Sequence, residues 1–216
     1  MIDRSIRIEA LSEQNADAWN ALFLASNCSC FCHYWHFEGS KNDWLARCAE
    51  DREHDRQEQV ARLRDGALDA RGLLAMRDGA AVGWMKLTPR GCLAKLRRQG
   101  AYRNLDLGDD EGIWSIGCFL VHPAARRLGV ARALALSAEH WVRAWGGRAI
   151  EAYPHRVAHP LHDEEAWMGP EAIFRAADWT KVHDCAPYPV YRKNLEASGG
   201  SNRSVRNDAG RPKALT

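Results

Sequence analysis

The alternation of apolar and polar positions along the chain predicts strands and helices in mixed order. Residues 5–11, SIRIEAL, alternate as a half-buried strand does, and a helical period around Trp19 follows them. Asp43 is the expected N-cap of a long charged helix that ends before Gly66. The sparse apolar positions of that helix predict a large face exposed to solvent.

A β-hairpin has the strongest local signal, because the pair Asp78–Gly79 stands between two apolar runs. Residues 113–121, IWSIGCFLV, form an apolar run that suits a central strand buried on both faces. From 127 to 145, apolar residues recur at helical spacing until a glycine pair ends the pattern. The order is that of an α/β protein without internal repeats. The remaining predicted elements are a strand (149–153), a helix (170–177) and two strands (180–185 and 188–193).

Composition and charge predict a single domain with a polar tail. The 216 residues are 46% hydrophobic and 27% charged, which suffices for one core, and no linker interrupts residues 1–196. Residues 197–216 are Gly/Ser-rich and are expected to be disordered. They carry four of the 30 basic residues but only one of the 28 acidic ones. The body is therefore nearly neutral, and nucleic-acid binding is not indicated.

Membrane insertion and export are not indicated either. No apolar run reaches the roughly 20 residues that cross a bilayer, and the N-terminus lacks a basic segment followed by an apolar signal core. The seven cysteines are an odd number, so we expect thiols rather than a disulfide framework. These features predict a cytoplasmic protein without a membrane partner.

The segment CSCFCHYWHF, residues 28–37, holds three cysteines and two histidines. These are zinc-ligand types, but structural zinc sites use two-residue gaps and a second distant pair, so we predict no metal site. Alternation places Cys28, Cys30 and Cys32 on one side of an extended chain, where buried thiols act as apolar filler. A substrate-lining or reactive role for this segment remains an alternative.

The strand at 113–121 runs through His122–Pro123 into a loop and then a helix, which is an arrangement that can bind phosphate. Gly129 and Ala131 have minimal side chains, so an anion can approach the backbone NH groups of the first helical turn. The sequence contains neither the lysine-bearing nucleotide loop nor a GxGxxG motif after a strand. An ordinary strand-to-helix connection with surface arginines is the alternative.

The pattern Arg126-x-x-Gly129-x-Ala131, after an apolar strand and a Val121-x-Pro123 step, resembles the acetyl-CoA signature of the GNAT acyltransferase superfamily. The segment WMGPEAIFRAADWTKV, residues 167–182, is similar to the late motif of that superfamily, and the resemblance covers residues 5–195. It implies a mixed, mostly antiparallel sheet of six or seven strands, splayed in the middle and flanked by helices. It also implies acetyl-CoA as co-substrate, bound by Phe119, Leu120, Val121, Arg126, Arg127, Leu128, Gly129, Val130, Ala131, Arg132 and Phe174.

The chemistry that the resemblance implies is attack of an amine on the thioester of acetyl-CoA. The site must then take up a proton from the amine, stabilise an oxyanion and protonate the leaving thiolate. A strand amide near Leu120 is the oxyanion candidate, and Glu151, His122 and His33 are the candidate bases. The superfamily often has a tyrosine as thiol acid where this chain has Phe174. Either Tyr153 or a thiol takes that role here, or the thiolate leaves with help from water.

A subset of GNAT-like sequences carries a similar C-x-C-x-x-x-W stretch after the first helix, and Trp35 completes it here. This likeness implies substrate contact by Cys32, His33, Tyr34 and Trp35. The expected partner is a small-molecule amine, and the expected state is a monomer or homodimer. Two other functions remain open: a CoA-binding module without catalysis, and a thiol-based metal or redox sensor.

Overall fold

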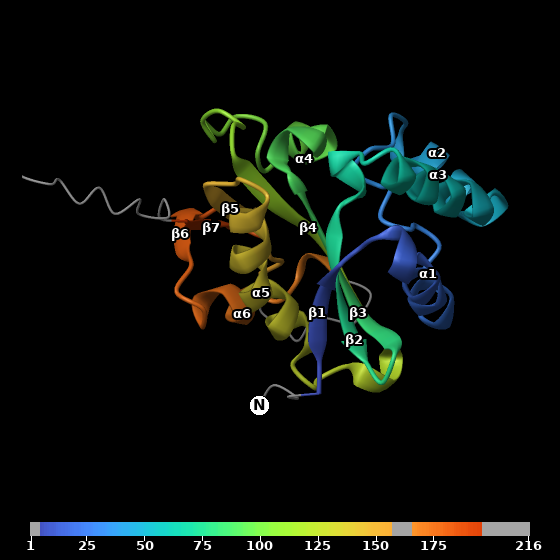
Figure 1. Cartoon of the computed structure of the whole chain (residues 1–216). Coiled ribbons are helices and arrows are strands. Elements are labelled where there is room, and N and C mark those ends of the chain that lie inside the picture. The colour runs from blue at the N-terminus through green and yellow to red at the C-terminus, as the bar shows by residue number, and fades with distance from the viewer. Residues whose placement is uncertain (1–4, 157–165, 196–216) are drawn as a thin grey trace, which may run out of the picture.

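One mixed sheet of seven strands forms the centre of the molecule, as seen in a computed structural model that describes residues 5–156 and 166–195. The strands are β1 (Arg7–Ala10), β2 (Gly72–Arg77), β3 (Ala80–Pro89), β4 (Ile113–Val121), β5 (Ala149–Ala152), β6 (Thr180–His183) and β7 (Val190–Asn194). Their order in the sheet is β1-β2-β3-β4-β5-β7-β6, and only β4 and β5 are parallel (Figure 1). The predicted mixed, mostly antiparallel sheet is confirmed.

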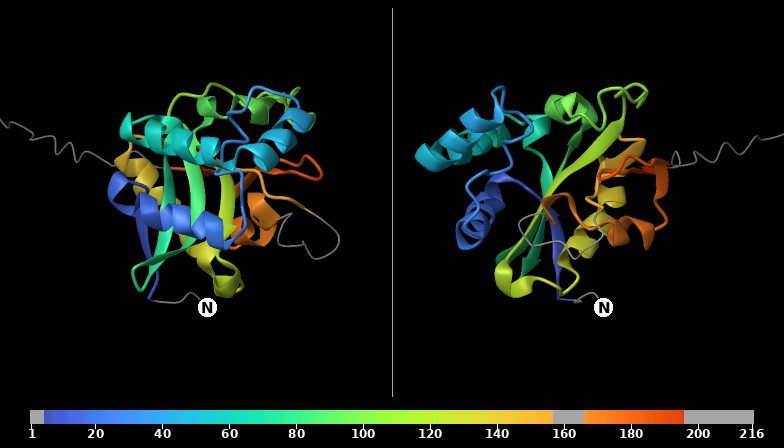
Figure 2. Two further views of the ribbon diagram at one scale, coloured as in Figure 1. Left: turned by 90° about the vertical axis from the view of Figure 1, so that its right-hand side faces the viewer. Right: turned by 180° about the vertical axis from the view of Figure 1, so that it is seen from behind.

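Helices cover both faces of this sheet. The helices are α1 (Ala16–Ala25), α2 (Lys41–Glu50), α3 (Arg52–Arg64), α4 (Ala94–Arg98), α5 (Val130–Ala144) and α6 (Glu171–Arg175). Helices α1, α2 and α3 lie on one side of the sheet, and α5 and α6 lie on the other (Figures 1 and 2). Short 3-10 turns occupy 13–15, 68–70, 90–92, 123–125 and 166–168.

The hairpin between β2 and β3 forms where the Asp-Gly pair predicted it. Asp78 and Gly79 have φ angles of 52° and 80°, so both central residues adopt the left-handed conformation that a tight hairpin turn needs. The register pairs Leu73 with Met85 and Leu74 with Trp84, and both β2 and β3 are almost entirely buried. The apolar composition of the two runs therefore follows from burial on both faces.

The long charged helix expected after Asp43 is instead two helices, α2 and α3, with a break at Asp51. Ser40, not Asp43, is the N-cap of α2: its Oγ accepts from the Asp43 amide at 3.2 Å, and Asp43 accepts from the Ser40 amide at 2.8 Å. Asp51 ends α2 with φ −138° and accepts from the His54 amide at 3.1 Å. Two side-chain caps thus divide a segment that has no glycine or proline to mark the break.

Strands β4 and β5 separate halfway along β4, which produces the splay that the resemblance implied. They pair only from Ile113 with Ala149 to Ile116 with Ala152, whereas β4 continues to Val121. Two residues beyond β5, Pro154 has no NH for a ladder and favours divergence of the chain. The open stretch of β4 is therefore available to a ligand.

No helix among the described residues is long and apolar enough to cross a membrane. The predicted disordered tail, 197–216, lies outside the described residues. The boundary of the domain at 196 remains a prediction.

Candidate active site

A cleft of about 500 Å³ opens between the separated end of β4, the start of α5 and the segments on either side of 157–165. Its walls bring together nine of the eleven residues predicted to hold the cofactor. They are Phe119, Leu120, Val121, Arg126, Arg127, Gly129, Val130, Ala131 and Arg132.

Helix α5 begins with Val130, three residues later than predicted, and the delay places its free amides in the cleft. Its N-cap, Gly129, has φ +83°, a conformation that glycine adopts without steric cost. The first-turn NH groups, from Val130 to Arg132, have no acceptor within the helix. The positive end of a 15-residue helix therefore faces the cleft beside three arginines, which suits a diphosphate.

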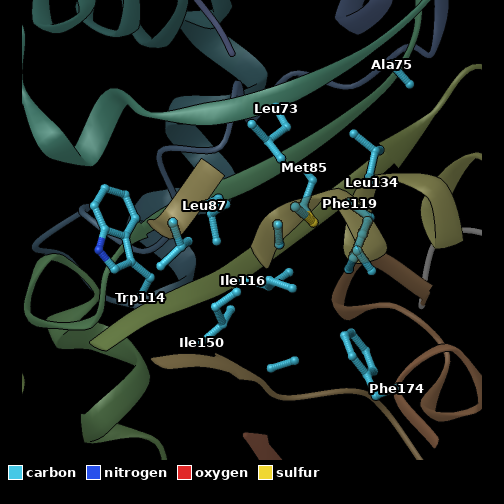
Figure 3. Close-up of a cluster of buried hydrophobic side chains, with 14 of the residues drawn as sticks. Leu73, Ala75, Met85, Leu87, Trp114, Ile116, Phe119, Leu134, Ile150 and Phe174 are labelled. Carbon is cyan, nitrogen blue, oxygen red and sulfur yellow. The ribbon is translucent and has the colours of Figure 1, made fainter. Parts of the chain in front are cut away.

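Two predicted cofactor residues do not line the cleft. Leu128 points to solvent with 43% of its surface exposed. Phe174 is fully buried in the hydrophobic core, where its ring lies 6.5 Å from that of Phe119 and 5.2 Å from that of Trp179 (Figure 3). Phe174 thus packs behind Phe119, which lines the cleft, and its predicted contact with the cofactor is wrong.

Glu151, predicted as a base, lies in a buried ionic cluster away from the cleft wall. Its Oε1 is 3.0 Å from Nη1 of Arg90 and 2.8 Å from Nε of Arg192, and the side chain has no exposed surface. The Tyr153 hydroxyl donates to its Oε2 at 2.7 Å. Both carboxylate oxygens are therefore occupied by buried partners, and Glu151 does not line the cleft, so its position does not fit the predicted role of base.

Tyr153 belongs to the same cluster. Its hydroxyl also lies 3.0 Å from the Ser115 hydroxyl, and burial raises the pKa of the phenol well above its usual value. A phenol enclosed between Ser115 and Glu151 does not reach the cleft, so it is not the acid that protonates a thiolate there. The cluster instead ties β4 to β5 just before they separate.

The two predicted histidine bases also lie outside the cleft wall. His122 Nδ1 accepts from the Ala124 amide at 3.2 Å, which caps the 3-10 turn after β4. His33 is buried with Nδ1 3.6 Å from Glu58, and burial lowers its pKa to about 3. The His33 imidazole is therefore neutral at pH 7 but a poor proton acceptor.

The structure adds His155, Arg156 and Glu171 to the cleft, none of which the sequence pattern singled out. His155 follows β5, pairs in a parallel bridge with Pro170, and stacks on Tyr188 with ring centres 4.7 Å apart. Arg156 donates to Glu171 at 2.6 and 2.9 Å, and this pairing lowers the pKa of Glu171 to about 2. His155 is thus the imidazole on the described cleft wall.

The cysteine segment packs against the sheet on the side of α1. Sγ of Cys28 and Sγ of Cys30 are 3.5 Å apart, and Trp84 Nε1 donates to Cys32 Sγ at 3.0 Å. Burial raises the pKa of the Cys32 thiol, so it is protonated and unreactive as a nucleophile. These contacts agree with thiols acting as apolar filler.

The described residues include one group of side chains with metal-ligand spacing, formed by His33, Asp55 and Glu58. The Arg47 guanidinium lies 2.6 Å from Asp55 and 3.0 Å from Glu58. One guanidinium is thus shared between two carboxylates, and burial raises the pKa of Asp55, whose two carboxylate oxygens have no hydrogen-bond partner among the described residues.

Aromatic rings form a wall next to the cleft. The centres of Trp35 and Tyr34 lie 5.4 and 6.1 Å from that of Trp167, and the neighbour of Trp167, Ala166, lines the cleft. Tyr34 also lines a second hollow of about 550 Å³ together with Lys95. Of the four predicted substrate residues, Tyr34 lines this hollow, whereas the buried residues Cys32, His33 and Trp35 line neither the hollow nor the cleft.

A splayed sheet whose opening meets a glycine-capped helix start and three arginines suits a ligand with a diphosphate and an extended arm. The chain belongs to the acetyltransferase (GNAT) family, whose model matches residues 17–166. As a member, it is an N-acetyltransferase that uses acetyl-CoA as co-substrate. The expected enzyme class and the expected co-substrate are both confirmed.

Solved structures with a similar fold include PaiA N-acetyltransferase from Thermoplasma acidophilum with coenzyme A, at 13% identity and a TM-score of 0.49, covering 88% of this chain and 99% of that one. YncA of Salmonella typhimurium, a putative acetyltransferase solved with acetyl-CoA, has 14% identity and a TM-score of 0.49 over 91% and 98% of the two chains. Ribosomal-protein-alanine N-acetyltransferase from Brucella melitensis has 17% identity and a TM-score of 0.48 over 88% and 99%. No curated protein matches.

Proposed function

We propose that this acetyltransferase transfers the acetyl group to an amine of a small molecule. The observation that carries the proposal is the contact of Tyr34 and Trp35 with Trp167, the residue that follows Ala166 of the cleft wall. Aromatic faces attract flat or cationic groups, so this wall suits an amine with planar or positively charged character.

The cleft residues fit acetyl-CoA by charge and by shape. The amides of Val130, Ala131 and Arg132 would hold the diphosphate, and the nearby arginines would neutralise it. The backbone of Phe119 to Val121 would hold the pantetheine arm in the splay. Bound acetyl-CoA supplies an acetyl thioester whose carbonyl carbon accepts the amine and whose sulfur then leaves.

We assign the proton transfer to His155. Its imidazole lines the same cleft as Phe119 and Leu120, so it can take the proton of the attacking amine directly or through one water. A strand amide near Leu120 would stabilise the oxyanion. The imidazolium can then pass the same proton to the departing sulfur, because a thiol is a weaker acid than an imidazolium. No tyrosine is required for that step.

Two further proposals concern the location and the oligomeric state of the protein. The seven cysteines are all free thiols, as is usual in a reducing compartment, which supports a cytoplasmic location. The oligomeric state, a monomer or a homodimer, remains a prediction.

An amine panel tests the proposed acceptor class. Purified protein, acetyl-CoA and a thiol-detecting reagent are combined with individual small amines, with peptides that present a free N-terminus, and with buffer alone. We expect acetyl-CoA to raise the melting temperature and a subset of small amines to release CoA in amounts equal to the acetylated product. Release with peptides alone would contradict the small-molecule acceptor, and a raised melting temperature without release from any amine would favour the non-catalytic module.

A further inference from the structure

We propose that Trp35 is a positioning residue for the reaction: its indole fixes the bulge in β4 that sets the direction of the cleft-lining strand. The proposal rests on the binding of acetyl-CoA in the cleft, and it gives the C-x-C-x-x-x-W segment a role. That role is separate from the substrate contact considered above. It concerns the shape of the backbone beneath the thioester.

The bulge lies at Gly117. In the β3–β4 register Lys86 pairs with Cys118 and Leu87 with Ile116, so Gly117 has no partner on β3. The β4–β5 register ends at Ile116, so Gly117 has no partner on β5 either. A buried backbone carbonyl at such a point needs another donor.

Trp35 supplies that donor across 82 residues of sequence. Its Nε1 donates to the Gly117 carbonyl oxygen at 2.7 Å, and the side chain is 2% exposed. The fit is close, because a Cβ added to Gly117 would lie 3.2 Å from Cδ1 of Trp35. The indole therefore holds the carbonyl, and a larger residue at the bulge would press on the indole.

The segment that carries Trp35 is itself fixed to the sheet. Trp84, on β3, donates from Nε1 to Cys32 Sγ at 3.0 Å, and Phe31 and Cys32 have φ angles of 38° and 60°. Residues other than glycine adopt such angles only when surrounding contacts hold them. The Trp84 indole of the sheet thus donates to the segment, and the Trp35 indole of the segment donates to the sheet.

The consequence for catalysis follows from position along β4. Phe119 and Leu120, which line the cleft, come two and three residues after the bulge. A change in the peptide plane at Gly117 would rotate the amides that face the thioester carbonyl. Electrostatic stabilisation of an oxyanion depends on the placement of its donors, so such a rotation lowers the rate without removing any contact to the diphosphate.

The test uses acetyl-CoA labelled with 13C at the acetyl carbonyl, and needs no acceptor amine. In the unmodified protein, the carbonyl resonance should move on binding because a strand amide donates to it. In Trp35→Phe, which keeps an aromatic ring but loses the donor, about half or more of that movement should be lost while the dissociation constant for CoA changes by less than about twofold. With an active amine, kcat should fall about tenfold.

Gly117→Ala is a second variant, in case Trp35→Phe does not fold. Its added methyl group presses on the indole while Trp35 stays in place, and we expect the same loss of movement of the carbonyl resonance.

Trp44→Phe is the matched control, because Trp44 lies in the same aromatic group, 5.6 Å from Tyr34. It should leave the resonance unchanged. A full movement in Trp35→Phe or Gly117→Ala, or an equal loss in Trp44→Phe, overturns the proposal. An unmodified protein without a bound resonance would refute the cofactor site itself, and the role of Trp35 with it.

Discussion

Gly129→Glu should weaken CoA binding about 100-fold relative to the unmodified protein. The substitution places a carboxylate at the N-cap of α5, where the structure assembles free amides and three arginines for a diphosphate. It also forces a side chain into a φ of +83°, which adds strain to the loop. Isothermal titration calorimetry with CoA measures the effect.

Gly129→Gln is the matched control for this substitution, because it imposes nearly the same size and strain without charge. We expect it to bind CoA about tenfold more tightly than Gly129→Glu at low salt, with the difference shrinking as salt rises. Equal affinities for the unmodified protein and Gly129→Glu would show that the diphosphate lies elsewhere.

His155→Gln should lower kcat by about 100-fold or more while the dissociation constant for CoA stays within about threefold. Glutamine keeps a polar side chain on the cleft wall but cannot carry the proton from amine to sulfur. Steady-state rates of CoA release with an active amine give kcat, and isothermal titration calorimetry with CoA gives the dissociation constant.

His140→Gln serves as the control, because His140 is exposed on α5 and contacts Trp141 rather than the cleft. Its kcat and its dissociation constant for CoA should match those of the unmodified enzyme. If His155→Gln keeps the full rate, the proton passes to another group, and the assignment of His155 is wrong.

The parts of the fold that could be predicted from sequence are those with local causes. The Asp78–Gly79 turn needs two left-handed residues, and this pair provides them. The apolar run 113–121 became β4 with the same bounds, since a strand buried on both faces carries few polar residues. Gly129 stands out for a similar reason, because its left-handed conformation at the start of α5 is a property of a single residue, and the binding of the cofactor there stays a prediction.

The errors concern side chains whose partners are distant in sequence. Glu151 has the charge of a base, but Arg90 and Arg192 approach it only in the folded sheet and hold it as an ion pair. The place of His155 on the cleft wall could not be read from periodicity, because it is a loop residue and its neighbour Pro170 lies 15 residues away. The one available hint was the pair Pro154–His155 just after β5.

The break between α2 and α3 was missed for a different reason. The chain from 41 to 64 is helical in composition throughout, and the interruption rests on side-chain caps by Ser40 and Asp51. Asp43 looked like a cap because it does take part in one, as the third helical residue that bonds back to Ser40.

A crystal structure of the protein with CoA is the most direct test of the cofactor site. We expect the diphosphate within hydrogen-bonding distance of the amides from Gly129 to Arg132, with the pantetheine arm running beside Phe119 to Val121. A diphosphate bound away from the start of α5, or an arm that does not enter the splay between β4 and β5, would contradict this placement.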